Sequence, residues 1–313
     1  MNENFRQDVD TGLSATPKQL LSKYFYDETG DSLFVKIMNM PEYYLTNSEY
    51  EIFTTQAEDI IKAFGVNGGT LELIELGAGD GTKTIELLKV LQGKTNFTYV
   101  PIDISQNALD LLCLRLAKEV PGINVQPLQG DYFSVLADIK QHQAQKVILF
   151  LGSNIGNMLD HNARRFVRQL CEQLNHGDKV LLGVDLKKDA SIILPAYNDA
   201  QGITRDFNLN LLTRINRELG GNFVVSLFEH KPLYNEELGQ AESYIQSMKD
   251  QDVHIKATGK TYHFDKGERI HMEISRKYDD KTINDIISDT GLQLKHKFTD
   301  SKNYFADYIL VME

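Results

Sequence analysis

Cysteine is scarce in this 313-residue chain, which contains only Cys113 and Cys171. Two cysteines are too few for a disulfide framework or a zinc site, so both are expected to be reduced residues in helix cores. Long apolar runs are also missing. The run at 147–152, VILFLG, is far too short to span a bilayer, and residues 1–10 lack the apolar centre of a signal peptide. The sequence therefore predicts a cytoplasmic globular protein.

Basic residues are outnumbered by acidic ones. The 33 lysines and arginines face 44 aspartates and glutamates, which gives a formal net charge of −11, and no local basic patch offsets it. This balance argues against binding to nucleic acid or to anionic lipid, because both are polyanions. The chain is 42% hydrophobic and longer than one average domain, so one large or two moderate domains with a real core are expected.

Short apolar runs alternate with amphipathic helical stretches from about residue 70 to 190. This alternation is typical of a parallel sheet built from βαβ units. The predicted strands are LELIEL, FTYVPID, INVQPLQG, KVILFLG and KVLLGVDL, and the crossover helices are TKTIELLKVLQ, SQNALDLLCLRLAKEV and NARRFVRQLCEQLN. Near the end, KTINDIISDTG predicts a helix closed by Gly291, and LQLKHKF and YFADYILVM predict an antiparallel hairpin. A Rossmann-like, doubly wound α/β sheet that ends in such a hairpin is the layout of class I methyltransferases.

Two further stretches predict a second, α+β domain. Residues 1–60 contain a helix ended by Pro41, then Thr46 and Glu49 at the spacing of a capping box. Residues 196–275 begin with a long helix, in which apolar residues recur every four positions, and continue with several strands. The predicted domains are a methyltransferase domain of residues 61–195 and 276–313 and a substrate-binding domain of residues 1–60 and 196–275.

A glycine-rich stretch, ELGAGDGTKT, follows the first strand of the sheet and opens a helix. Gly77, Gly79 and Gly81 would let a ligand approach the backbone at the carboxyl end of that strand. The dinucleotide fingerprint needs a glycine at position 82, where the chain has Thr82, and the GxxxxGK phosphate loop is missing. The alternative is that these glycines are purely structural turn residues.

Acidic residues follow the next two strands. Asp103 ends the second strand, where its carboxylate can accept both hydroxyls of a ribose or, alternatively, cap the helix that begins near Ser105. In the tetrapeptide GDYF, Asp131 can accept from an adenine amino group and Tyr132 can offer its ring. Lys83 is available to a carboxylate. Together these features predict an S-adenosylmethionine site formed by Gly77, Gly79, Lys83, Asp103, Asp131 and Tyr132.

The stretch IHMEISRKY, residues 270–278, alternates as a half-exposed strand does. Period-two alternation places His271, Glu273 and Ser275 on one face, opposite the apolar side chains. That face is either an ordinary solvent-exposed strand face or a binding face that carries a carboxylate and a hydroxyl.

Six segments resemble the histidine-specific S-adenosylmethionine methyltransferases, which make hercynine, the trimethylated betaine of histidine, in ergothioneine biosynthesis. They span nearly the whole chain and are KYFYDETGDSLFVKIMNMPEYYLT, ELGAGDGTKT, PIDIS, LFLGSNIGN, AYNDAQGITRDFNLNLLTRINRELG and IHMEISRKY. The resemblance implies an amino-acid N-methyltransferase with a small-molecule substrate. It also implies that the α-carboxylate and α-amine are bound by Tyr26, Tyr43, Gly152, Asn157 and Tyr197, and the imidazole by Glu273 and Ser275.

Asn157 and Tyr26 are the predicted catalytic residues. Methyl transfer needs the amine lone pair in line with the methyl group, so catalysis should be mostly positioning, with one proton lost to a base or to water. The amide oxygen of Asn157 can orient the amine, and phenol hydroxyls can hold the carboxylate. Alternatively, each tyrosine is an ordinary interface or core residue, and Asn157 is a turn residue after Gly156.

One position departs from the family pattern. With unchanged spacing, Ser243 stands where the family places a methionine against the imidazole, unless the alignment slips by one residue. The pocket is then larger or more polar, and the Glu273 carboxylate could also accept the N–H of an indole. Tryptophan or a derivative is therefore the alternative substrate. A protein that binds S-adenosylmethionine without turnover is a further alternative, and the presence of the amine-binding residues argues against it.

Overall fold

The computed structural model describes residues 3–66, 69–130, 140 and 144–313. The chain divides into two compact units: unit 1 comprises Met1–Tyr44 and Lys188–Arg276, and unit 2 comprises Leu45–Lys187 and Lys277–Glu313. The first boundary falls earlier than the predicted residue 60. The reason is that helices α3 (Tyr44–Thr55) and α4 (Ala57–Ala63) contribute buried side chains to the core of unit 2.

Unit 2 is built on a sheet of mostly parallel strands. The strand order is β13-β14-β7-β6-β2-β3-β4, and β5 also pairs with β3. Strands β2, β3, β6 and β7 run parallel, whereas β14 is antiparallel to both β7 and β13. The strands are β2 (Leu71–Leu76), β3 (Phe97–Asp103), β4 (Asn124–Val125), β5 (Leu128–Gln129), β6 (Gln145–Phe150), β7 (Lys179–Asp185), β13 (Leu292–Thr299) and β14 (Phe305–Met312). The predicted doubly wound sheet with its closing hairpin, the class I methyltransferase layout, is confirmed.

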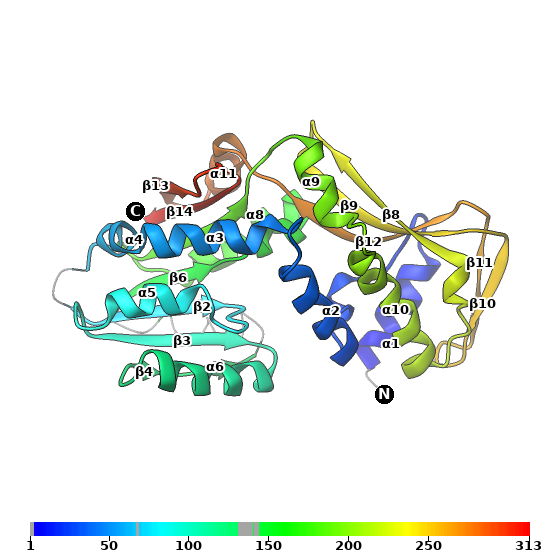
Figure 1. Cartoon of the computed structure of the whole chain (residues 1–313), viewed down its shortest axis with the longest axis horizontal. Helices are drawn as coiled ribbons and strands as arrows, with labels where there is room; N and C mark the ends of the chain where they lie inside the picture. The colour runs from blue at the N-terminus through cyan, green and yellow to red at the C-terminus, as the bar shows by residue number, and fades with distance from the viewer. Residues whose placement is uncertain (1–2, 67–68, 131–139, 141–143) are drawn as a thin grey trace. The chain divides into compact units, whose positions relative to one another are not determined.

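Helices cover both faces of this sheet. One core layer joins the sheet to α8 (Asp160–Cys171) and α11 (Asp280–Ile287), and the other joins it to α3, α4, α5 (Thr84–Leu91) and α6 (Gln106–Glu119). Figure 1 shows α4 beside α5, on the side of the sheet where α3 also lies. Strands covered on both faces are mostly apolar, which explains the four leucine and isoleucine residues of LELIEL; Glu72 and Glu75 are the exceptions.

Both cysteines of the chain lie in helices of unit 2. Cys171 is buried at the end of α8, Cys113 is partly buried in α6, and both are free.

The stretch INVQPLQG, predicted as one strand, forms the two short strands β4 and β5, with Pro127 between them. Proline lacks the N–H that a sheet ladder needs, so the strand is interrupted there.

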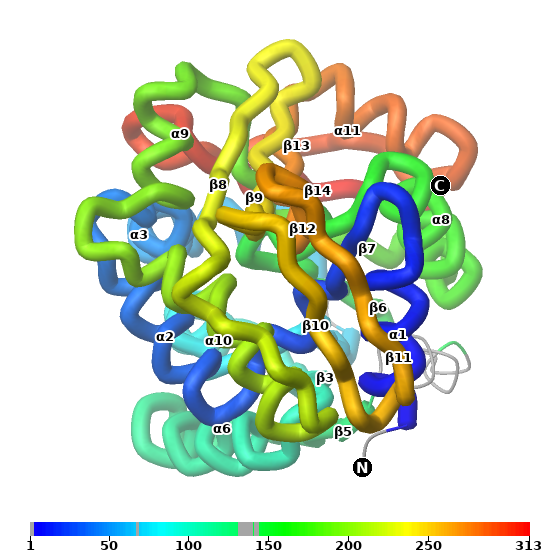
Figure 2. The backbone as a smooth tube through the Cα atoms, turned by 90° about the vertical axis from the view of Figure 1, so that its right-hand side faces the viewer, coloured from blue at the N-terminus to red at the C-terminus, as the bar shows by residue number. Residues whose placement is uncertain are grey.

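Unit 1 combines a four-stranded sheet, a two-stranded hairpin and four α-helices among its described residues. The sheet has the order β1-β12-β9-β8, and Figure 2 shows β9 between β8 and β12. The strands are β1 (Lys18–Gln19), β8 (Phe228–Asn235), β9 (Gln240–Ser247), β10 (Gln251–Ile255), β11 (Lys260–Phe264) and β12 (Arg269–Arg276); the helices are α1 (Glu3–Ser14), α2 (Glu28–Met38), α9 (Ala190–Tyr197) and α10 (Ile203–Leu219). Throughout the described ranges, no helix has the length and apolar content required to cross a membrane.

Helix α10 is the long helix that the four-residue apolar repeat predicts. Phe207, Leu211 and Ile215 are buried in the core of unit 1. Gly220 ends the helix with a φ of 65°, a left-handed conformation that favours glycine. Tyr197, which the sequence placed at the start of this helix, instead ends α9, so that detail was wrong.

The predicted capping box of Thr46 and Glu49 is also wrong. Helix α3 begins at Tyr44, so Thr46 lies within its first turn instead of preceding it. Glu49 is fully buried, and its carboxylate accepts the backbone N–H of Gly152, more than a hundred residues further along the chain. A sequence pattern cannot distinguish a glutamate that caps its own helix from one that reaches a distant loop.

Candidate active site

The loop between β2 and α5 turns through three left-handed glycines. Their φ values are 77° for Gly77, 54° for Gly79 and 66° for Gly81. This conformation costs other residues roughly 1–2 kcal/mol each. Gly77 N–H donates to the carbonyl of Ile102 at 2.8 Å, which ties the loop to the end of β3. A Cβ on Gly79 would meet no atom within 4 Å, so the backbone there is open to a ligand.

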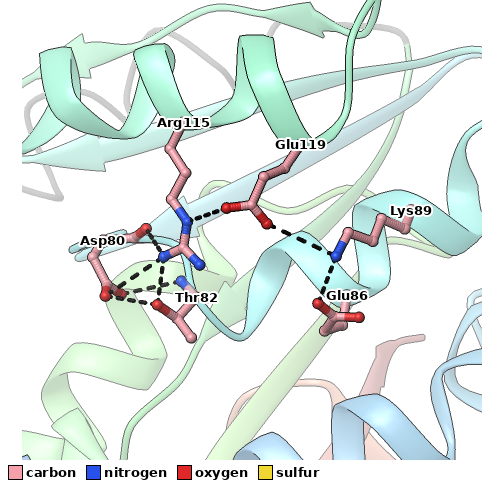
Figure 3. A network of polar contacts seen from close by, with 6 residues as sticks. All are labelled: Asp80, Thr82, Glu86, Lys89, Arg115 and Glu119. Carbon is pink, nitrogen blue, oxygen red and sulfur yellow. Dashed lines mark hydrogen bonds and ion pairs between the residues drawn. The ribbon is translucent and has the colours of Figure 1, made fainter.

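Helix α6 holds this loop from one side (Figure 3). Arg115 Nη1 donates to the Asp80 carbonyl at 3.1 Å and to the Thr82 hydroxyl at 2.5 Å. The Thr82 hydroxyl in turn donates to the Asp80 carboxylate at 2.6 Å. A Cβ on Gly81 would overlap the side chain of Leu112, so glycine there lets the helix approach closely. Thr82, which breaks the dinucleotide fingerprint, is thus an anchor for Arg115.

The same network continues to α5. Glu119 accepts from Arg115 Nε at 2.7 Å and lies 3.8 Å from Lys89 Nζ, which pairs with Glu86 at 2.8 Å. Ion pairs as exposed as these contribute less than about 1 kcal/mol each to stability. Their main consequence is therefore to fix the position of the Arg115 guanidinium over the glycine loop.

Asp103 lies beside the glycine loop at the carboxyl end of β3. Its Oδ2 accepts from Gly79 N–H at 3.2 Å, and its Oδ1 accepts from Ser105 N–H at 2.9 Å. The cap of α6 is Ser105, whose hydroxyl accepts from Ala108 N–H at 3.2 Å. A carboxylate has about four acceptor positions, so two hydroxyl donors can still be accommodated. The donors and acceptors at this edge of the sheet therefore fit a ribose.

Lys83 pairs with a buried carboxylate. Its ammonium contacts Glu49, whose side chain is fully buried, while the Lys83 side chain is 23% exposed. Burial acts to lower the pKa of Lys83, but the surrounding acidic groups, Glu49 foremost, together outweigh it, so the pKa is raised overall. Lys83 is therefore a cation at neutral pH. Asp131 and Tyr132, the predicted adenine contacts, lie outside the described residues.

The loop after β6 contains two consecutive left-handed residues. The φ values are 69° for Gly152 and 59° for Ser153, and the second costs about 1–3 kcal/mol in a residue with a side chain. Two contacts hold the turn: Gly152 N–H donates to Glu49 Oε1 at 2.8 Å, and the Ser153 hydroxyl accepts from Asp185 N–H at 3.0 Å. The loop then forms the short 3-10 helix η2 (Asn154–Asn157), which ends with the exposed side chain of Asn157.

The strand that carries Glu273 and Ser275 has a β-bulge. His271 lies opposite Tyr244, but Glu273 lies opposite Ser243, so the register shifts between them. Paired residues of antiparallel strands share a face, and neighbours on one strand do not. Glu273 and Ser275 are therefore on the face opposite that of His271. The prediction that the three residues share a face is wrong, because a bulge adds a residue that simple alternation does not register.

Helix α9 contributes to the face of β12 that carries Glu273 and Ser275. The Tyr197 hydroxyl donates to Ser275 Oγ at 2.7 Å, and both residues are buried. Tyr43 packs against the small apolar cluster that contains Tyr197 and Ala241. Unit 1 thus brings a phenol, a hydroxyl and a carboxylate onto one face of its sheet.

Ser243 and Tyr26 have contrasting surroundings. Ser243 is 1% exposed, and its hydroxyl has no hydrogen-bond partner in the part of the chain that the structure describes. Tyr26 is 43% exposed and packs edge-on against the rings of Phe34 and Phe207, with ring centroids 5.5 and 5.7 Å apart.

Of the predicted substrate residues, unit 1 contains Tyr26, Tyr43, Tyr197, Ser243, Glu273 and Ser275, and unit 2 contains Gly152 and Asn157.

Sequence reasoning missed Glu49 and Arg115. Glu49 falls on the same helical face as Leu45, Ile52 and Phe53, all of them buried. A charged residue within an apolar stripe is a signal of a buried polar contact and could have pointed to it. Arg115 gives no comparable signal, because a basic residue four positions before a glutamate, as Arg115 is before Glu119, is common on exposed helix faces.

The strand order of unit 2, with a glycine loop and Asp103 at the carboxyl edge of the sheet, defines a class I S-adenosylmethionine methyltransferase. The family described as "Histidine-specific methyltransferase, SAM-dependent" matches residues 5–312. The chain belongs to this family. The predicted enzyme class and the predicted cofactor, S-adenosylmethionine, are therefore confirmed, and the alternative of binding without turnover is not favoured.

Curated relatives are similar over nearly the whole chain. Identity is 34% with the histidine N-alpha-methyltransferase of Mycolicibacterium smegmatis, over 97% of this chain and 94% of that protein. It is 28% with ergothioneine biosynthesis protein 1 of Schizosaccharomyces pombe, over 94% of this chain but 39% of the longer relative. It is 29% with an L-tryptophan methyltransferase of Psilocybe serbica, over 98% of this chain and 92% of that protein.

Proposed function

We propose that this protein transfers methyl groups from S-adenosylmethionine to the α-amino group of histidine and forms the trimethylated betaine hercynine. Family membership and the similarity to a histidine N-alpha-methyltransferase along both chains support this proposal. The observation that carries the choice of histidine is the arrangement of Tyr197, Ser275 and Glu273 on one face of β12.

The cofactor is assigned to unit 2. Gly77 and Gly79 would lie along the ligand, Asp103 would accept the ribose hydroxyls, and Lys83 would contact the methionine carboxylate. When bound, the cofactor supplies a methyl group on a sulfonium, an electrophile that a neutral amine can attack. The assignment of Asp131 and Tyr132 to the adenine stays a prediction.

The amino and carboxylate groups of histidine are assigned to five residues. In unit 2, the Gly152 backbone and the Asn157 amide would bind the amine end, and the amide oxygen would accept from an amine N–H. In unit 1, the hydroxyls of Tyr26 and Tyr43 would donate to the carboxylate, and Tyr197 would line the same end of the substrate while its hydroxyl donates to Ser275. Asn157 and Tyr26 would be the catalytic residues, since Asn157 orients the amine whose lone pair reacts and Tyr26 holds the carboxylate beside it. The amine proton would leave to a base or to water.

The imidazole is assigned to Glu273 and Ser275, with Ser243 beside them. A hydroxyl that accepts one hydrogen bond, as Ser275 does from Tyr197, can also donate its own hydrogen, whereas a carboxylate accepts. The pair thus consists of a hydroxyl, which can donate or accept, and a carboxylate, which accepts. Neutral imidazole has one N–H and one bare nitrogen and matches both, while an indole has only the N–H and matches one. This complementarity favours histidine over tryptophan.

The test is the structure of the product. The protein is incubated with histidine and S-adenosylmethionine, and the product is fragmented in a mass spectrometer. Three methyl groups on the α-nitrogen are expected. Methyl groups on the imidazole ring would contradict the assignment, because the substrate would then bind in the opposite direction.

We also propose that the protein acts in the cytoplasm on free amino acid, without a nucleic-acid or membrane partner. The net charge of −11 supports the lack of a polyanionic partner. Formation of the methylated product in an assay that contains neither nucleic acid nor membrane would agree with this.

A further inference from the structure

Four ionisable side chains lie in the layer between the sheet of unit 2 and helices α3 and α5. They are Glu49 on α3, Glu75 on β2, Lys83 before α5 and Asp307 on β14. Glu49 and Asp307 are fully buried, and Glu75 is 4% exposed. Only Lys83 has a place in the proposed chemistry. The acidic members of the cluster therefore require a separate explanation, since burial of charge is costly.

Glu49 connects two loops. Its Oε1 and Oε2 accept the Gly152 N–H at 2.8 and 3.1 Å, and Oε2 also pairs with the Lys83 ammonium. Gly152 opens the loop that leads to Asn157, and Lys83 closes the glycine loop. One carboxylate thus ties the loop proposed to bind the amine to the loop proposed to bind the cofactor.

The strand next to Glu49 makes room for its side chain. Gly183 on β7 is the register partner of Asp307 on β14. A Cβ on Gly183 would overlap Glu49 Oε1 and would lie 2.9 Å from Asp307 Oδ1. The two carboxyl groups therefore meet over a glycine, and any larger residue there would displace at least one of them.

Asp307 is the second carboxyl group at this point. Both of its oxygens are buried and have no hydrogen-bond partner among the residues that the structure describes. Burial, followed by the charge of Glu49, raises the pKa of Asp307 well above its usual range, and Lys83 opposes this only in part. One ammonium compensates one carboxylate. Glu49 receives the ammonium and the backbone N–H, so Asp307 is the neutral member of the pair.

We propose that Glu49 is a positioning residue of this enzyme, whose carboxylate fixes the Gly152 loop and the Lys83 ammonium relative to each other, with Asp307 as its neutral neighbour. The proposal rests on the roles proposed above for the Gly152 loop and for Lys83. Glu49 itself touches neither substrate nor cofactor in this account, and acts through the groups that it holds.

Three substitutions separate this role from a merely structural one. Glu49→Gln keeps the size of the side chain and one acceptor for Gly152 N–H, but leaves the Lys83 ammonium without its counter-ion. Asp307→Asn copies the shape of a protonated aspartic acid. Glu75→Gln is the matched control, because it replaces another buried carboxyl group of the cluster whose hydrogen bonds come from Thr84 and Tyr99.

The measurements are the calorimetric affinity for S-adenosylhomocysteine and the Tm of each free protein. Loss of a charge-assisted contact predicts that Glu49→Gln weakens the affinity about 10- to 100-fold. Asp307→Asn should stay within about threefold of wild type, as expected when no charge is removed. Glu75→Gln should change the Tm without a comparable loss of affinity.

A double-mutant cycle with Lys83→Met gives the decisive readout. If Glu49 acts through Lys83, the double variant binds S-adenosylhomocysteine no more weakly than Lys83→Met alone. Wild-type affinity in Glu49→Gln, additive losses in the double variant, or an equal loss in Asp307→Asn would overturn the proposal.

The affinity measurement is independent of the amino-acid substrate. If wild type methylates no histidine but the affinities follow the expected pattern, the proposed function fails and the positioning role stands. If histidine is methylated and the affinities do not follow the pattern, the positioning role alone fails. A wild-type protein that binds no S-adenosylhomocysteine overturns both.

Discussion

Replacing Glu273 by alanine removes a carboxylate from the β12 face to which α9 contributes Tyr197. If this carboxylate accepts the imidazole N–H, its loss leaves a buried donor of the substrate without a partner. Such a loss costs about 1–3 kcal/mol, which corresponds to roughly a 5- to 150-fold decrease in kcat/KM for histidine. An amino acid with an apolar side chain has no such donor and should be affected much less. The expected result is therefore a change in specificity rather than a uniform loss of activity.

The assay is the ratio of kcat/KM for histidine to that for phenylalanine, measured in wild type and variants by product mass. The β-bulge supplies a matched control, His271→Ala, on the same strand. His271 pairs with Glu242 at 3.2 Å on the opposite face of the sheet, so its loss should leave the ratio unchanged. An unchanged ratio in Glu273→Ala, or an equal decrease in His271→Ala, would refute the reasoning. Glu273 would then be a strand residue without a role in substrate binding.

Four other predictions concern the cofactor loop, the pocket and pH. Asp103→Ala should weaken S-adenosylhomocysteine binding by about 1.5–3 kcal/mol in calorimetry; unchanged affinity would remove it from the site. Arg115→Ala should also weaken this binding, whereas Lys89→Ala, at the far end of the same network, should not. Ser243→Met should lower KM for histidine, with a gain of about 0.3–1.5 kcal/mol from contact between sulfur and ring; a higher KM would contradict this. Burial raises the pKa of Glu75 to about 7, so its contribution to stability is full below pH 4.5 and is lost as pH rises through 7. Between pH 5 and 8 wild type should therefore lose up to about 3 kcal/mol of unfolding free energy more than Glu75→Gln, and parallel losses in denaturant titrations would contradict this.

The fold could be predicted because its signals are local. Each parallel strand is a short, mostly apolar run, each crossover helix has apolar residues three and four apart, and the closing hairpin follows a short amphipathic helix. That helix ends at Ile287 and its C-cap is Ser288, so the prediction that Gly291 closes it was wrong. Irregularities within strands were harder to predict, because they leave no periodic signal in the sequence. Pro127 divides one expected strand into two, and the bulge after His271 moves Glu273 to the other face.

The candidate site could be predicted only where its residues are fixed by strand ends. The glycines and Asp103 follow β2 and β3, whose carboxyl ends are neighbours in a parallel sheet, so their proximity follows from the fold. Contacts between distant segments carry no comparable signal. The contacts of Arg115 with Thr82 and of Glu49 with Gly152 depend on how the helices pack on the sheet. For Glu49, the spacing from Thr46 indicated a helix cap instead.

The measurement that tests the central claim most directly is a competition among substrates. The protein is given S-adenosylmethionine and an equimolar mixture of the twenty amino acids, and all methylated products are quantified by mass spectrometry. The account predicts that α-N-methylated histidine, proceeding to the trimethylated betaine, is the dominant product. A mixture dominated by methylated tryptophan, or by any amino acid whose side chain lacks both a donor and an acceptor, would contradict it.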